Sequence, residues 1–192
     1  LVNTKKNIKI GVVLAPDFNP FVDEIKRGVM SEARKISAFG VELEIEVVHT
    51  IDEYEQLEIL NKLQQNDVAA VAIVPIDKDV IRNKINELVE SGTPVVTFNS
   101  DISGTKRLCF VGQDNYKAGR TIGGIAAKTI SKKASVGIIT SNENFLCHKN
   151  RVDGFISKLR EIEDITIAGI EQNDDMDETA CAITVKYIEN IK

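Results

Sequence analysis

The stretch IKIGVVLAPDFNPF, residues 8–21, decides the fold of this chain. Its first half, Ile8–Leu14, is a short apolar run bounded by turn-forming residues, which is typical of a strand buried on both faces. Four side chains suited to ligand recognition follow directly: Asp17, Phe18, Asn19 and Phe21. Because open α/β sheets bind small ligands at the carboxyl ends of their parallel strands, we predict that these residues lie at a binding edge.

The composition indicates a soluble globular chain. Its 192 residues are 43% hydrophobic and 28% charged, enough for one large domain or two smaller lobes. The longest apolar run, Val68–Ile76, is far shorter than the ~20 residues of a membrane-spanning helix, and no apolar signal core begins the chain. A net charge of −5 argues against a nucleic-acid surface, which needs clustered Lys and Arg. We expect no membrane contact and no direct DNA contact.

The cysteines and histidines show no metal-binding or redox pattern. Cys109, Cys147 and Cys181 lie far apart and form no CxxC pair. The two histidines, His49 and His148, have no acid or thiol at ligand spacing, and His49 falls at a predicted strand end, where we expect a structural role. We predict no metal, no cofactor and three free thiols in a reducing compartment, the cytoplasm.

Helices and strands alternate along the first part of the chain. Apolar spacing predicts helices at 25–36, 57–63 and 81–88, and strands at 41–47, 68–74, 95–99 and 108–111. Asp77 suits a helix cap better than a ligand contact, and Gly92 with Pro94 supplies a helix stop. Strands alternating with amphipathic helices require right-handed crossovers, so we predict a parallel, doubly wound α/β sheet.

The alternation of helices and strands restarts after Gly112, but it includes fewer strands than the first part of the chain. It predicts helices at 115–131, 152–159 and 180–191, and strands at 136–140 and 165–170. A two-stranded parallel sheet with three helices cannot cover both of its faces or satisfy its edges. We therefore expect the second lobe to be incomplete.

Four motifs together resemble the type I periplasmic-binding-protein superfamily. They are IGVVL with NPF at 10–14 and 19–21, PVVTFN at 94–99, VGQDN with Gly119 at 111–119, and RVDGF at 151–155. Their order and spacing fit over essentially the whole chain. Within the superfamily, the chain is most similar to the effector domain of the LacI/GalR family of transcriptional regulators and its ribose-binding relatives.

The resemblance implies a two-lobe clamshell of doubly wound parallel sheets, with an N-terminal lobe at 1–113 and a partial C-terminal lobe at 114–192. It also implies a sugar or sugar-like metabolite in the cleft between the lobes. The ligand contacts implied are Phe18, Asn19, Phe21, Asn99, Asp114, Asn115 and Arg151. Sugars present apolar C–H faces and hydroxyl rims, which suit aromatic walls and hydrogen-bonding Asn, Asp and Arg side chains.

Several of these residues also fit ordinary structural roles. Asn19 with Pro20 is typical of a helix start, and Asp114 of a helix cap. Arg151, taken alone, is typical of a solvated helix face; the RVDGF motif instead makes it a cation that reaches the ligand. Asn99 and Ser100 stand where sugar-binding relatives often carry Asp and Arg, which argues against a simple aldopentose or hexose.

No enzyme signature is present. The sequence has no G-x-G-x-x-G after the first strand, no phosphate-binding P-loop and no G-x-S-x-G elbow. Gly119, Gly123 and Gly124 lie inside a predicted helix, where close helix packing is their expected role. A flavodoxin-like or receiver-like domain is a further alternative, although Pro75–Asp77 only weakly imitates a receiver's phosphoacceptor site. We predict that the chain is not an enzyme.

The sequence therefore predicts the sugar-sensing effector domain of a LacI-type regulator. Ligand binding would favour the closed clamshell by its differential affinity, and DNA would be reached only through a headpiece absent from this chain. Residues 1–7 resemble the connector that follows such a headpiece. Because repressors of this type pair side by side, we expect a homodimer. The alternative is an extracytoplasmic sugar-binding protein of an ABC transporter or chemoreceptor, which shares the fold and the cleft.

Overall fold

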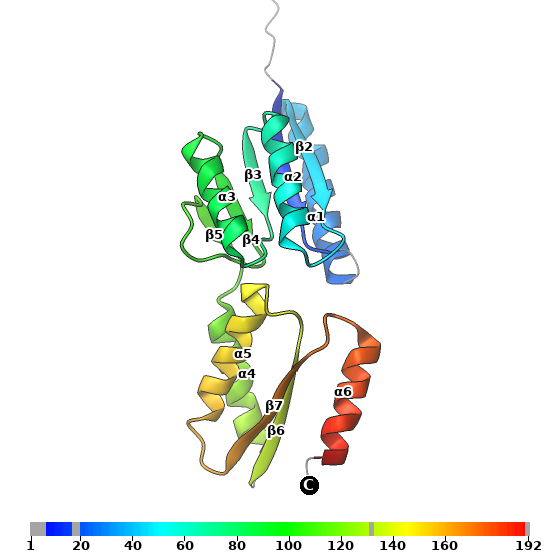
Figure 1. Cartoon of the computed structure of the whole chain (residues 1–192), viewed down its shortest axis with the longest axis vertical. Coiled ribbons are helices and arrows are strands. Elements are labelled where there is room, and N and C mark those ends of the chain that lie inside the picture. Colours follow the sequence, from blue (N-terminus) through cyan, green and yellow to red (C-terminus); the bar gives the residue numbers. More distant parts are fainter. Residues whose placement is uncertain (1–6, 17–19, 131–132, 191–192) are drawn as a thin grey trace, which may run out of the picture. The chain divides into compact units, whose positions relative to one another are not determined.

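The computed structural model of the chain describes residues 7–16, 20–130 and 133–190. The chain forms two compact units, Leu1–Gly112 and Gln113–Lys192 (Figure 1). We call them unit 1 and unit 2. The division falls one residue before the boundary predicted between 113 and 114.

Unit 1 is built on a parallel sheet with the predicted doubly wound order. Its strands are β1 (Ile8–Leu14), β2 (Val41–Val47), β3 (Ala70–Ile73), β4 (Val95–Phe98) and β5 (Cys109–Val111). Among the described residues their order is β2-β1-β3-β4-β5. The chain thus moves from β1 to one side and then crosses back to the other, which creates the switch point where such sheets bind ligands.

Helices cover both faces of this sheet, because successive strand residues point to opposite faces. Helix α1 (Pro20–Ile36) packs over Val12 and Leu14 of β1. Helices α2 (Glu53–Gln65) and α3 (Asp79–Glu90) pack over Val13 on the other face (Figure 1). A short 3-10 turn, η1 (Ser37–Phe39), joins α1 to β2. The apolar spacing in the sequence therefore predicted which helix faces are buried.

The predicted role of Asp77 as a helix cap is wrong. The cap position of α3 is Lys78, whose side chain makes no capping bond. Asp77 lies one residue too early to bond the first-turn N–H groups, and its Oδ1 instead accepts from Arg82 Nη2 at 2.9 Å. This ion pair ties the loop after β3 to α3.

Unit 2 has two strands and three helices in the part of it that is described. They are α4 (Asn115–Thr129), β6 (Ala134–Thr140), α5 (Leu146–Leu159), β7 (Ile165–Gln172) and α6 (Asp177–Asn190). Strands β6 and β7 pair in parallel. Helices α4 and α5 lie on one side of the strands and α6 on the other (Figure 1), where its Tyr187 ring packs over Gly137 and Gly169. Several large apolar side chains of this unit are exposed: Ile122, Ile125, Ile170, Val185 and Ile188.

Helices α4 and α5 cross with their backbones in contact, because glycine removes the side chain on each side of the crossing. A Cβ added at Gly119 would lie 2.0 Å from the Arg151 carbonyl oxygen, and one at Gly154 would lie 2.0 Å from the Tyr116 carbonyl oxygen. The predicted packing role is confirmed for Gly119 and Gly123. It is wrong for Gly124, where the nearest atom to an added Cβ is 3.8 Å away.

Every helix in the described ranges is too short or too polar to cross a lipid bilayer.

Candidate functional site

The carboxyl end of β1 leads toward the residues predicted to bind a ligand. Asp17, Phe18 and Asn19 lie outside the described residues. Helix α1 begins at Pro20, as the sequence predicted. Phe21, its second residue, is 53% exposed, whereas Val22 is buried. Phe21 therefore presents an exposed aromatic ring in the first turn of α1.

Asn99 stands at the carboxyl end of β4 in a left-handed conformation, with φ of 60°. Its N–H donates to the Val111 carbonyl of β5 at 3.0 Å, and Ser100 behind it is fully buried. The left-handed conformation ends the strand one residue earlier than predicted. A residue held in this conformation by its neighbours is common at binding sites.

Asp114 caps helix α4. Its Oδ1 accepts from the Lys117 backbone N–H at 3.0 Å, and its Oδ2 lies 3.1 Å from Lys117 Nζ. These contacts with Lys117, the backbone hydrogen bond first, lower the pKa of the Asp114 carboxyl. Both carboxylate oxygens therefore have partners, which agrees with the capping role that the sequence offered.

Asn115 and Arg151 contact one another directly. Asn115 is buried, and its Oδ1 accepts from Arg151 Nη2 at 2.6 Å and from Gln113 Nε2 at 3.1 Å. Arg151 forms no ion pair with a carboxylate within the described ranges. The solvated-surface role considered for Arg151 is therefore wrong: its guanidinium is partly buried and held by a neutral amide.

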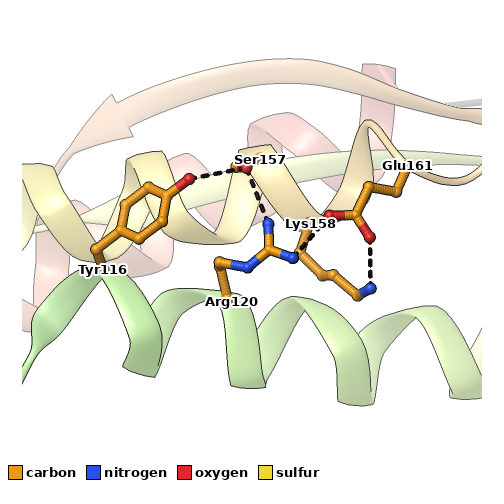
Figure 2. Close-up of polar contacts among 5 residues, drawn as sticks. All are labelled: Tyr116, Arg120, Ser157, Lys158 and Glu161. Atoms are coloured by element: carbon orange, nitrogen blue, oxygen red, sulfur yellow. Dashed lines mark hydrogen bonds and ion pairs between the residues drawn. The ribbon is translucent and has the colours of Figure 1, made fainter.

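A polar network on α4 and α5 stabilises the same crossing (Figure 2). Tyr116 Oη donates to Ser157 Oγ at 2.9 Å, and Arg120 Nη1 donates to the same oxygen at 3.1 Å. Arg120 Nη2 also pairs with Glu161 at 2.7 Å, and Lys158 pairs with Glu161 at 2.5 Å. These contacts fix the rotation of the two helices about each other, and so the positions of Asn115 and Arg151.

A cavity of about 430 Å³ lies beside Arg151 within unit 2. Its walls are largely apolar and come from α4, β6 and α5. Its polar lining residues follow the carboxyl ends of β6 and β7 or begin α5: Thr140, Ser141, His148, Arg151 and Asp175. Ser141, His148 and Asp175 were not predicted from the sequence, although the strand-end rule that selected Asn99 applies equally to Ser141, which directly follows β6.

Two polar residues that line the cavity, Ser141 and His148, have unusual environments. The Ser141 hydroxyl is buried with no hydrogen-bond partner among the described residues. Burial lowers the pKa of the His148 imidazole; the Asp175 carboxylate raises it in part, and the Arg151 guanidinium lowers it. Buried polar groups without partners and shifted pKa values are concentrated at functional sites.

No cluster of three or more potential metal ligands occurs in the described part of the chain. Cys109 and Cys181 are free and exposed, and Cys147 is buried.

The chain is similar to several sugar-binding proteins. It is 28% identical to the ribose import binding protein RbsB of Bacillus subtilis (strain 168) over 151 residues, which cover 79% of this chain and 48% of RbsB. Among solved structures, the XylFII-LytSN complex is 28% identical, with a TM-score of 0.85 over 96% of this chain and 66% of that one. The glucose-galactose binding protein GanP of Geobacillus stearothermophilus is 26% identical, with a TM-score of 0.85 over 96% of this chain and 65% of GanP. The chain thus spans about half the length of its curated relative.

These relatives correct the functional prediction. RbsB is named as a ribose import binding protein and GanP as a glucose-galactose binding protein, so the prediction of a LacI-type transcriptional regulator is wrong and the alternative, a sugar-binding protein, is favoured. The predicted cytoplasmic location is contradicted too, since the matching family is described as a periplasmic binding protein domain and RbsB is named as an import binding protein. The homodimer stays a prediction.

The sequence model of the family described as "Periplasmic binding protein domain" matches residues 10–190, which include nearly all of both units. The sheet order of unit 1 and the motifs from Ile10 to Phe155 agree with that match. The chain belongs to the periplasmic binding protein family.

Proposed function

We propose that this chain carries sugar-binding residues of an extracytoplasmic solute-binding protein that serves a sugar importer. The contact between Asn115 and Arg151 carries the proposal. A guanidinium held by an amide keeps its full charge and several free N–H donors, because no carboxylate among the described residues neutralises it. Such a group suits the hydroxyl oxygens of a sugar. The import role described for RbsB supports this assignment.

Unit 1 is proposed to carry further sugar-binding residues. The chain contains phenylalanine and tyrosine but no tryptophan. We therefore propose that the rings of Phe18 and Phe21 contact the apolar C–H face of a sugar ring. Asn99 and Asn19 offer amides that both donate and accept hydrogen bonds. Asn99 lies directly after the carboxyl end of β4, and Phe21 lies in the first turn of α1, the helix that follows β1.

Titration calorimetry on the natural full-length protein tests the proposal. The panel comprises D-ribose, D-glucose, D-galactose, D-arabinose, D-allose and myo-inositol, the ligand types named for its relatives. We expect at least one saturable isotherm at pH 7.5. If none of these compounds binds while another chemical class does, the sugar assignment is wrong.

The Asp114→Ser variant separates a helix cap from a ligand contact. Serine caps helices about as well as aspartate, so we expect an unchanged melting temperature and unchanged sugar affinity. Asp114→Ala removes the cap and should lower the melting temperature only. A tenfold or larger loss of affinity in Asp114→Ser would instead make Asp114 a ligand contact.

A further inference from the structure

Three titratable side chains line the cavity of unit 2, and they come from two elements. His148 and Arg151 belong to α5, and Asp175 belongs to the loop between β7 and α6. The nine other lining residues are glycine, apolar or hydroxyl residues, and they carry no charge. The charge state inside this cavity therefore depends on one histidine, one arginine and one aspartate.

The His148 ring is held in place from its own helix. His148 is the third residue of α5, and its N–H donates to the Phe145 carbonyl at 3.0 Å. Its ring meets the Phe145 ring edge to face, at 6.5 Å between centroids and an angle of 76°. Phe145 is itself buried. A neutral imidazole fixed in this way offers one N–H donor and one nitrogen acceptor.

Asp175 is held in place by a strained loop. Asp174 and Asp175 both have left-handed conformations, with φ of 49° and 61°. Each such residue costs conformational energy, although Asp tolerates this region better than most residues do. Two contacts with the end of β6 keep the loop in this shape: Asp174 Oδ1 accepts from Asn142 Nδ2 at 2.8 Å, and the Asn173 N–H donates to the Thr140 carbonyl at 2.9 Å. Backbone strain maintained in this way is typical of ligand-binding loops.

We propose that His148 and Asp175 are recognition residues of this site, and that the site binds a neutral sugar only while the His148 imidazole is uncharged. This inference rests on the proposed sugar-binding function. Asp175 accepts hydrogen bonds from sugar hydroxyls, and it disfavours an acidic sugar because it places a carboxylate in the cavity. His148 adds an acceptor and a donor that match a hydroxyl group.

Protonation of His148 opposes binding for two reasons. A sugar that fills the cavity displaces the water that would solvate an imidazolium, while Arg151 keeps a like charge beside it. The imidazolium would also attract Asp175 and compete with the sugar for that carboxylate. By linkage, a sugar that prefers the neutral ring must lower the pKa of His148 when it binds.

The test uses the natural full-length protein and the sugar of the panel that binds it at pH 7.5. Calorimetry at pH 7.5 and pH 5.0 should show a weaker affinity at the lower pH, by up to the roughly 300-fold that the release of one proton allows over this range, because one proton changes affinity at most tenfold per pH unit. His148→Gln should remove this dependence. His49→Gln is the matched control, since His49 is the other histidine and is exposed in unit 1, and it should retain the dependence. Asp175→Asn should weaken binding at pH 7.5.

A second measurement does not depend on a variant that folds. The histidine ring signals of the natural protein can be followed by NMR across the pH range, with sequence-specific resonance assignment identifying His148. Saturation with the sugar should lower the pKa of His148. Absence of any sugar isotherm at pH 7.5 overturns the proposed function and this inference with it. Equal affinity at both pH values, or an unchanged His148 titration at saturation, overturns this inference alone.

Discussion

The Arg151→Ala variant of the full-length protein is expected to bind its sugar roughly 10- to 150-fold more weakly, the equivalent of about 1.5–3 kcal/mol for hydrogen bonds to a charged group. The effect is large because the guanidinium has no carboxylate partner in the described ranges and is partly buried. Titration calorimetry with the sugar that binds the natural protein measures it. The melting temperature should change little, since Asn115 Oδ1 keeps its bond from Gln113 Nε2.

Two further variants isolate the role of Arg151. Arg151→Lys keeps the charge but loses the planar fork of donors, so its affinity should lie between those of the natural protein and Arg151→Ala. Arg160→Ala is the matched control, because Arg160 is exposed at the end of the same helix. Affinity unchanged in Arg151→Ala, with the control also unchanged, would return Arg151 to a structural role.

The fold could be predicted from the sequence because its signals are local. The apolar run at residues 8–14 predicted the buried strand β1. The spacing of Ile81, Ile85 and Leu88 predicted the buried face of α3. Because crossovers between parallel strands are right-handed, only a few orders of the strands in the sheet are then possible. Helix ends were predicted less well: Asp77 looked like a cap, but the helix began one residue too late for its side chain to reach an N–H.

The candidate site was only partly predictable because it depends on tertiary contacts. Asn115 and Arg151 were each singled out, but their mutual hydrogen bond follows from the close crossing of α4 and α5. Asp175 was missed because its position depends on a left-handed loop that only the contacts with β6 maintain. The choice between a regulator and an import protein could not be made from these residues at all, since both classes share the same ligand-binding core.

The Gly119→Ala variant is expected to lose stability in unit 2, by about 1–3 kcal/mol or more. A methyl group there would lie 2.0 Å from the Arg151 carbonyl oxygen, which is backbone and cannot rotate away. The helices must separate, so the melting temperature measured by circular dichroism should fall by roughly 4 °C or more. Because Asn115 and Arg151 sit on either side of this crossing, sugar affinity should fall as well.

Gly124→Ala is the matched control on the same helix. An added Cβ there has ordinary van der Waals distance to its nearest neighbour, 3.8 Å away. Alanine also favours a helix over glycine by roughly 0.5–1 kcal/mol, so this variant should be as stable as the natural protein or more stable. Equal melting temperatures for Gly119→Ala and Gly124→Ala would mean that α4 and α5 separate without cost. In that case, close backbone packing would not position Asn115 against Arg151. The polar network of Tyr116, Ser157 and Glu161 would position them instead.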